Sequence, residues 1–160
     1  IGIPFTKILT NLGILRNHLA IKEYYKKVSG DQLSKLHLYP KTLYILKSLN
    51  KKNIDFSIVT SKDITRTNKI LKKFNINPRS IHCPKKNLKG KPHPDQILEC
   101  LKKNQIKSLK NVCYVGDTDY DFLAAKRAGI DFIFCEYGYG KNLKKYKYKI
   151  KKFSELKNFF

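Results

Sequence analysis

Short apolar runs alternate with amphipathic segments along most of this chain. The run DFSIVT at 55–60 is β-branched and apolar and ends in a polar residue, which predicts a buried strand. Three further strands are predicted at 80–84, 111–116 and 131–138, and the intervening helices at 61–76, 94–106 and 121–129. Alternation of this kind indicates an α/β fold with a parallel sheet and helices on both faces.

The first part of the chain has a different pattern. Residues 1–38 are helical throughout and contain no predicted strand, and a helix at 38–54 then leads into the first strand. The leucines expected on one face of that helix are Leu43, Leu46 and Leu49. After the last strand, a lysine-rich loop precedes a terminal helix, FSELKNFF. We therefore expect a small helical module at 1–37 and an α/β core at 38–160.

Polar side chains follow two of the predicted strands, at the edge where a parallel sheet binds its ligands. Thr60 and Ser61 end the first strand, and their hydroxyls, together with the helix start that follows, suit a phosphate oxygen. Asp117 and Thr118 end the third strand, and Asp121 follows at a helix start. These groups can converge at one edge.

Lys91, in the loop KGKPHPD, can reach the same edge. Taken singly, these residues have ordinary explanations, because a lysine is by default a solvated charge and Asp121 can be a helix N-cap. The segment VGDTDYD at 115–121 is the exception. Two carboxylates four residues apart after a buried strand repel one another without a cation. We therefore favour a metal site at Asp117 and Asp121.

The chain carries a formal net charge of +22. That value suggests a polyanion partner, but 30 of the 34 basic residues are lysine, whereas base recognition and bidentate phosphate contacts favour arginine. The lysines are also scattered along the whole chain. We expect weak attraction to polyanions and no specific nucleic-acid partner.

Other features indicate the cellular setting. No apolar run approaches the roughly 20 residues that span a bilayer, and no signal peptide is visible, so we expect a cytoplasmic protein without a membrane partner. The four cysteines form no CxxC pair, which favours reduced thiols within the core. The sequence begins with Ile1 and contains no methionine, so we expect a fragment of a longer protein.

In order and spacing the motifs resemble the haloacid dehalogenase (HAD) superfamily, through IVTSK (58–62), KPHPD (91–95) and VGDTDYDFLAAKRAGI (115–130). Similarity is greatest to phosphoglycolate-phosphatase-like members, through LYP at 38–40 and YGYG at 137–140. The resemblance implies a three-layer, Rossmann-like α/β core with a parallel sheet at 38–160. It also implies that residues 1–37 are the C-terminal part of a helical cap.

The resemblance further implies a two-step phosphoryl transfer through an aspartyl-phosphate, with Mg²⁺ as cofactor. Thr60 and Ser61 would bind the phosphoryl oxygens, and Lys91 would balance charge between that group and the nucleophile. Asp117 would ligate Mg²⁺, and Asp121 would support the metal site from outside its ligand shell, through water or through Lys91. Such a transfer depends mostly on positioning and electrostatics.

One departure from the family is serious. Its first motif, a strand ending in DxDGT, supplies the nucleophile and the acid/base aspartate, and no strand here carries it. In the family that strand is central, between the strands at 55–60 and 111–116. We therefore predict a sheet that lacks its first strand and has an unpaired gap at that position.

Three hypotheses for function remain open. The first is a Mg²⁺-dependent phosphatase of a small cytosolic phosphomonoester, phosphoglycolate-like, in the full-length parent. The second is a catalytically inactive fragment or pseudoenzyme of the same fold. The third is a weak polyanion-binding protein. The substrate and the oligomeric state stay open.

Overall fold

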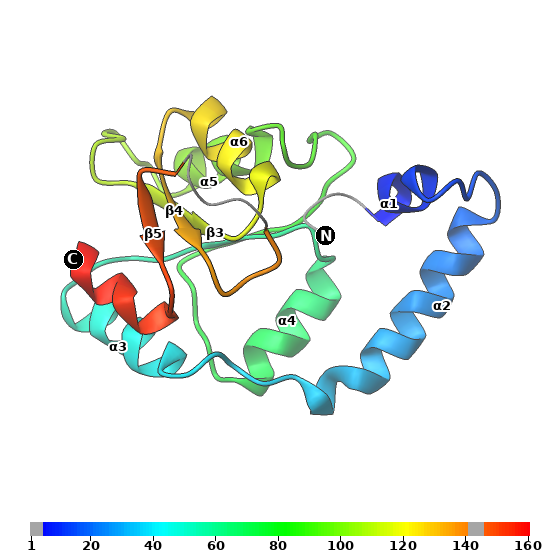
Figure 1. The fold of residues 1–160 in the computed structure, drawn as a ribbon, viewed down its shortest axis with the longest axis horizontal. Helices are drawn as coiled ribbons and strands as arrows, with labels where there is room; N and C mark the ends of the chain where they lie inside the picture. The colour runs from blue at the N-terminus through cyan, green and yellow to red at the C-terminus, as the bar shows by residue number, and fades with distance from the viewer. Residues whose placement is uncertain (1–4, 141–145) are drawn as a thin grey trace.

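The computed structural model describes residues 5–140 and 146–160, without the side chains of residues 29–31. Its helices are α1 (Phe5–Asn11), α2 (His18–Asp31), α3 (Thr42–Lys51), α4 (Ile64–Lys73), α5 (Asp95–Lys103) and α6 (Asp119–Ala128), with 3-10 helices η1 (Gln32–Lys35) and η2 (Phe153–Phe159). Its strands are β1 (Ile58–Val59), β2 (Ile81–His82), β3 (Cys113–Gly116), β4 (Asp131–Cys135) and β5 (Tyr148–Ile150). The predicted α/β class is confirmed (Figure 1).

All strand pairs in the described residues are parallel. β1 pairs with β2, with Ile58 opposite Ile81, and the second sheet has the order β3-β4-β5. Val115 of β3 lies opposite Ile133 of β4, which in turn lies opposite Tyr148 of β5. α4 connects β1 to β2 and α6 connects β3 to β4, because a parallel pair needs a crossover connection.

The predicted gap in the sheet is present. β1 and β3 share no backbone pairing in the part of the chain that the structure describes. A side chain spans them instead, since the Tyr114 hydroxyl of β3 donates to the Val59 carbonyl of β1 at 3.0 Å. A tyrosine side chain is longer than the roughly 4.8 Å that separates paired strands. The two sheets therefore stand apart, each with an open edge toward the other.

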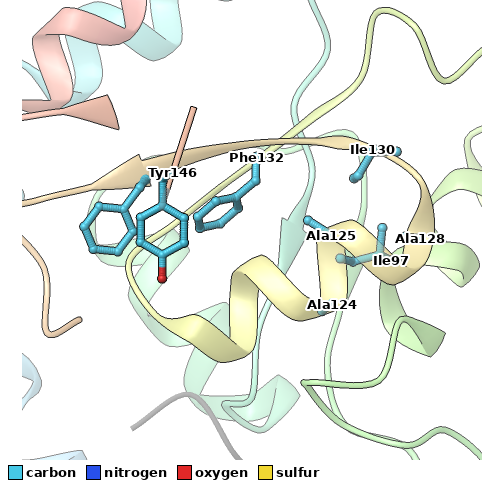
Figure 2. Close-up of a cluster of buried hydrophobic side chains, with 8 residues drawn as sticks. Ile97, Ala124, Ala125, Ala128, Ile130, Phe132 and Tyr146 are labelled. Carbon is cyan, nitrogen blue, oxygen red and sulfur yellow. The ribbon is translucent and has the colours of Figure 1, made fainter. Parts of the chain in front are cut away.

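Two apolar clusters cover the two faces of the β3-β4-β5 sheet. One face packs against α5 and α6, through Ile97, Ala124, Ala125, Ala128, Ile130, Phe132, Phe134 and Tyr146. Figure 2 shows the alanines of α6 beside Ile97 and Ile130, with the rings of Phe132 and Tyr146 farther along the sheet. Ala124 and Ala125 are fully buried, and their small side chains allow α6 to lie close to the strands.

The opposite face packs against α3 and η2, which lie together beside β5 (Figure 1). Ile45 of α3 and Leu156 of η2 meet Ile133, Cys135 and Ile150 there. Helices therefore cover both faces, as predicted.

The face predicted for the helix at 38–54 is wrong in part. Ile45 and Leu49 are the buried residues of α3, whereas Leu43 is 40% exposed. Leu49 lies both on the predicted face, with Leu43 and Leu46, and on the observed face, with Ile45, because residues three apart and residues four apart can both share a helix face. The sequence pattern alone did not decide which of these two faces is buried.

Two further expectations need correction. Residues 148–150, expected in a loop, form β5 on the edge of the second sheet. Flanking lysines hid its alternation, since Ile150 is buried while Lys149 faces solvent. Among the four cysteines, which are all free, Cys83 and Cys135 are buried but Cys113 is exposed at the start of β3. The expectation of a core thiol is wrong for Cys113, which is the exposed first residue of β3.

α1, α2 and η1 are the helices at the start of the described chain, where a helical module was predicted; that they form a separate domain stays a prediction. Phe5 of α1 stacks on Tyr25 of α2, with ring centroids 4.6 Å apart. Lys73 of α4 donates to three carbonyls at the end of the module, those of Leu33, Ser34 and Leu36, at 2.8–2.9 Å. The boundary between residues 37 and 38 stays a prediction. None of the described helices combines the length and apolarity required to cross a membrane.

Candidate functional site

A buried ion pair lies at the C-terminal edge of β3. The Lys91 ammonium lies 2.6 Å from Asp121 Oδ1, and the two residues are 7% and 4% exposed. The pair joins the loop before α5 to the first turn of α6. Removing either partner would leave an uncompensated buried charge, which costs far more than the loss of an exposed pair.

The start of α6 fixes the orientation of the Asp121 carboxylate. Thr118 is the N-cap, its hydroxyl accepts from the Asp121 backbone N–H at 3.2 Å, and the Asp121 carboxylate in return accepts from Thr118 N–H at 3.1 Å. Asp121 Oδ2 also accepts from the Thr118 hydroxyl at 2.6 Å. This is a capping box, so Asp121 occupies the third helical position and not the N-cap position considered from the sequence.

Asp121 therefore has a cation partner within the chain. The sequence argument for a metal rested on two carboxylates that repel one another, and Lys91 already supplies a positive charge to one of them. This geometry corresponds to one of the two routes predicted for Asp121, support of the site through Lys91.

Tyr114 connects these groups to β1. Its hydroxyl lies 3.1 Å from Lys91 Nζ, 3.4 Å from Asp121 Oδ1 and 3.0 Å from the Val59 carbonyl. Burial is the largest cause that raises the pKa of Tyr114 to about 12. Burial alone would lower the pKa of Lys91, but the neighbouring Tyr114 and Asp121 raise it above its usual 10.5. At neutral pH Lys91 is thus protonated and Tyr114 is a neutral phenol.

Thr60 reaches the same edge through its neighbour Val59. The Thr60 hydroxyl oxygen accepts from the Lys62 backbone N–H at 3.1 Å, at the turn that leads into α4. Gln96 of α5, 1% exposed, donates to the Thr60 carbonyl at 3.1 Å. Ser61 lies next to Thr60 and is partly exposed. The structure thus brings Lys91 and Asp121 into contact and links Thr60 to them through its neighbour Val59, whose carbonyl accepts from the Tyr114 hydroxyl.

Asp117 lies at the end of β3 and faces the segment that follows β4. Its Oδ2 accepts from the Tyr139 backbone N–H at 2.8 Å. A Cβ at Gly138 would overlap the Asp117 side chain, and one at Gly140 would overlap the Asp117 carbonyl oxygen. Glycine at both positions is therefore required for the chain to approach Asp117 this closely.

The donors at this edge suit Mg²⁺ better than a transition metal. Mg²⁺ commonly takes one or two carboxylates and fills its other positions with water and phosphate oxygens. Asp117 offers such a carboxylate, and Asp121 Oδ2 accepts from the Asp117 backbone N–H at 3.3 Å. Among the described residues no group of three or more His, Cys, Asp or Glu side chains is placed to hold a metal on its own.

Sequence reasoning missed Tyr114 and Gln96. The signal for Tyr114 was a phenol in the middle of an apolar strand, since a buried hydroxyl usually has a hydrogen-bond partner. Gln96 donates to the carbonyls of Thr60 and His82, so it links the ends of β1 and β2 to α5. Nothing in the spacing of residues along α5 predicted that Gln96 would be buried against these strands.

A second polar cluster has the spacing of a hydrolytic triad. His82 lies 3.0 Å from Ser80 Oγ and 2.9 Å from Glu99 Oε2. Ser80 is 5% exposed, and its hydroxyl oxygen is 2.8 Å from the amide nitrogen of Asn104 and 2.9 Å from the hydroxyl of Ser57. A nucleophile needs access to substrate, so this cluster is a structural link between β1, β2 and α5.

Comparison with known proteins gives a consistent family. A family model described as haloacid dehalogenase-like hydrolase matches residues 1–135. A phosphoglycolate phosphatase from Pasteurella multocida is 30% identical over 131 residues, which cover 78% of this chain and 56% of that protein. One from Vibrio parahaemolyticus is 32% identical over 117 residues, covering 69% and 48%. The chain thus spans about half the length of these relatives.

Solved structures agree on the fold. A haloacid dehalogenase-like family hydrolase from Streptococcus pneumoniae superposes with a TM-score of 0.81 at 22% identity, over 100% of this chain and 78% of that one. CbbY from Rhodobacter sphaeroides, solved in complex with phosphate, gives 0.76 at 16% identity, over 89% and 67%. At these identities the likeness supports the fold.

Proposed function

Because the chain belongs to the haloacid dehalogenase-like hydrolase family, we propose that it is the phosphate- and Mg²⁺-binding part of a phosphatase for a small phosphomonoester. The observation that carries this proposal is the buried Lys91–Asp121 pair at the open edge between β1 and β3. Two relatives are phosphoglycolate phosphatases, and the similar CbbY protein was solved with phosphate.

Each site residue has a role that its position supports. Lys91 balances the negative charge between the phosphoryl group and its attacker, and Asp121 and Tyr114 hold its ammonium in place. Thr60 and Ser61 donate hydrogen bonds to phosphoryl oxygens at the start of α4. Asp117 would hold Mg²⁺ through its carboxylate, and the ion would supply positive charge toward the phosphoryl oxygens.

The attacking carboxylate comes from an extended segment in the gap between β1 and β3. The two carboxylates described above are already engaged, Asp121 with Lys91 and Thr118, and Asp117 with the Tyr139 N–H. An added strand would complete the backbone pairing of both open edges and place its last residues beside Lys91.

The reaction then has two displacements at phosphorus. In the first, the carboxylate oxygen bonds to phosphorus as the bond to the substrate oxygen breaks, and the leaving alkoxide takes a proton from a second carboxylic acid on the same segment, the acid/base aspartate of the family's first motif. In the second, that aspartate takes a proton from a water molecule that attacks the acyl phosphate, which releases inorganic phosphate and restores the first carboxylate. We place this activity in the cytoplasm, because free thiols such as buried Cys83 and Cys135 are typical of a reducing compartment.

The test is Mg²⁺-dependent release of phosphate from phosphoglycolate and p-nitrophenyl phosphate by the protein in its natural full length. We expect Lys91→Met and Asp117→Asn each to reduce kcat/KM by at least about 100-fold, in the range found when one charge-stabilising group is removed. Lys89→Met, an exposed lysine in the same loop, is the matched control and should keep full activity.

The 160-residue chain assayed alone tests the role of the gap. We expect no turnover, since no attacking group is assigned within it. Turnover by this chain that needs Mg²⁺ and is lost on Asp117→Asn would mean that a described residue is the nucleophile. Activity that survives Asp117→Asn in the full-length protein would refute the proposed site.

A further inference from the structure

The pairing between β1 and β2 ends at Thr60. The Thr60 N–H donates to the His82 carbonyl at 3.0 Å, one residue beyond the end of β1. In a parallel ladder the Thr60 carbonyl would next accept from the N–H of the residue two places after His82. That residue is Pro84, which has no N–H. The strand pair therefore has no donor for the Thr60 carbonyl.

Gln96 of α5 supplies the donor that Pro84 lacks. Its Nε2 donates to the Thr60 carbonyl at 3.1 Å and to the His82 carbonyl at 3.4 Å. Both partners are carbonyl oxygens, which only accept hydrogen bonds, so the amide nitrogen and not the amide oxygen must face them. Gln96 is 1% exposed, so water does not compete for these bonds. A side chain thus completes the ladder at Thr60.

The other end of the same amide has no such use. Gln96 Oε1 is buried and has no hydrogen-bond partner within the part of the chain that the structure describes. A buried acceptor without a partner costs free energy, and an apolar side chain of equal length would avoid that cost. The glutamine therefore serves Thr60 while one of its own groups stays unpaired. This favours a role in holding Thr60 over a role in overall stability.

The orientation of Thr60 determines what its hydroxyl can bind. The hydroxyl oxygen accepts from the Lys62 backbone N–H at 3.1 Å, which leaves the hydroxyl hydrogen free to donate. On the side of β1 away from β2, no strand of the described chain supports this residue. The bonds from Thr60 to His82 and Gln96 therefore fix its backbone. A donor that moves by about 1 Å loses much of its effect on a bound phosphoryl group.

We propose that Gln96 is a positioning residue of the phosphate site. Its amide replaces the backbone donor that Pro84 lacks and holds Thr60 in the orientation in which the hydroxyl donates to a phosphoryl oxygen. The inference rests on the function proposed above, because it needs a phosphoryl group at Thr60. The contact between Gln96 and Thr60 stands on its own.

The test is a ³¹P NMR titration of inorganic phosphate into this chain with Mg²⁺. Gln96→Met keeps the length of the side chain and removes the donor. We expect Gln96→Met and Thr60→Val each to weaken phosphate about fivefold, the effect of one neutral hydrogen bond. Because Gln96 acts through Thr60, the double variant should bind within about twofold of Thr60→Val alone. Independent effects, which multiply in the double variant, would overturn the inference.

Asn104→Leu is the matched control. Asn104 is a buried amide at the other end of α5, and it donates to the Cys100 carbonyl and the Ser80 hydroxyl, each at 2.8 Å. It thus links α5 to the start of β2, away from Thr60. We expect Asn104→Leu to lower the urea midpoint and to bind phosphate like the wild type. Weakening as large as that of Gln96→Met would mean that any loosening of these strands has the same effect, which refutes a specific role.

A rescue variant tests the argument from Pro84. Pro84 is exposed, and Pro84→Ala returns a backbone N–H at that position. We expect Gln96→Met combined with Pro84→Ala to bind phosphate more tightly than Gln96→Met alone, because the strand pair can then serve the Thr60 carbonyl. A double variant that binds no more tightly would overturn the assignment of the Gln96 donor to that carbonyl.

The two proposals fail in different ways. If Thr60→Val weakens phosphate but Gln96→Met does not, the positioning role is refuted and the phosphate site stands. The Thr60 amide signal in ¹H–¹⁵N spectra of the ligand-free chain covers the reverse case. If the wild type binds no phosphate but Gln96→Met shifts that signal and Asn104→Leu does not, the proposed function is refuted and the hold of Gln96 on Thr60 is supported.

Discussion

Lys91→Met should be among the most destabilising single substitutions in this chain. Methionine keeps most of the buried side-chain volume and removes only the ammonium, so the loss reports the Asp121 carboxylate left without its cation. Breaking a buried pair costs about 3–5 kcal/mol. Asp121 Oδ2 keeps its donors from Thr118, while Oδ1 keeps only the Tyr114 hydroxyl at 3.4 Å. We therefore expect a loss near the lower limit, about 3 kcal/mol.

Urea unfolding followed by circular dichroism measures this loss. With a slope of roughly 2 kcal/mol per molar urea, the midpoint should fall by about 1.5 M. The exposed Lys89→Met should change the free energy of unfolding by less than about 0.5 kcal/mol. Lys91→Met combined with Asp121→Asn should be more stable than Lys91→Met alone, because the unpaired charge is gone. This reasoning would be refuted if Lys91→Met lost less than about 1 kcal/mol of stability, or if the double variant were less stable than Lys91→Met alone.

Two other substitutions test the neighbouring contacts. Tyr114→Phe should cost about 1–2 kcal/mol, since it removes a hydroxyl that contacts Lys91, Asp121 and Val59. The pKa of Tyr114 is raised to about 12 in the folded state, which favours the neutral phenol there. The stability that the Tyr114 hydroxyl contributes should therefore be constant below about pH 10 and vanish as the pH rises toward 12. Urea unfolding of the wild type and Tyr114→Phe at several pH values measures this. Gly138→Ala should cost about 1–3 kcal/mol by overpacking against Asp117, and less in an Asp117→Ala background; equal costs would argue against that contact.

Much of the fold could be predicted because its physical signals are local. Apolar β-branched runs identified β1 to β4, and Gly129 ended α6 in the left-handed conformation expected after a helix, with φ 74°. β5 was missed because lysines surround it on an exposed edge. The buried face of α3 was predicted only in part, since its core contacts come from η2 and β5, far along the chain.

The site was less predictable because its contacts are remote in sequence. Lys91 and Asp121 are 30 residues apart. The sequence placed both at one edge of the sheet, and only the family resemblance suggested that they act together. Two carboxylates four residues apart indicate positive charge nearby, yet no local pattern distinguishes a metal from a lysine, and the structure places Lys91 beside Asp121. Tyr114 acts across a gap in the sheet, and sequence periodicity carries no information about such a gap.

The most direct test of the central claim is Mg²⁺-dependent binding of inorganic phosphate to this chain, followed by ³¹P NMR. We predict that phosphate binds more tightly with Mg²⁺ than without it, and that Asp117→Asn abolishes this dependence while Lys89→Met preserves it. Phosphate binding that is indifferent to Mg²⁺, or equally Mg²⁺-dependent in Asp117→Asn, would contradict a site built from Asp117, Lys91 and Thr60.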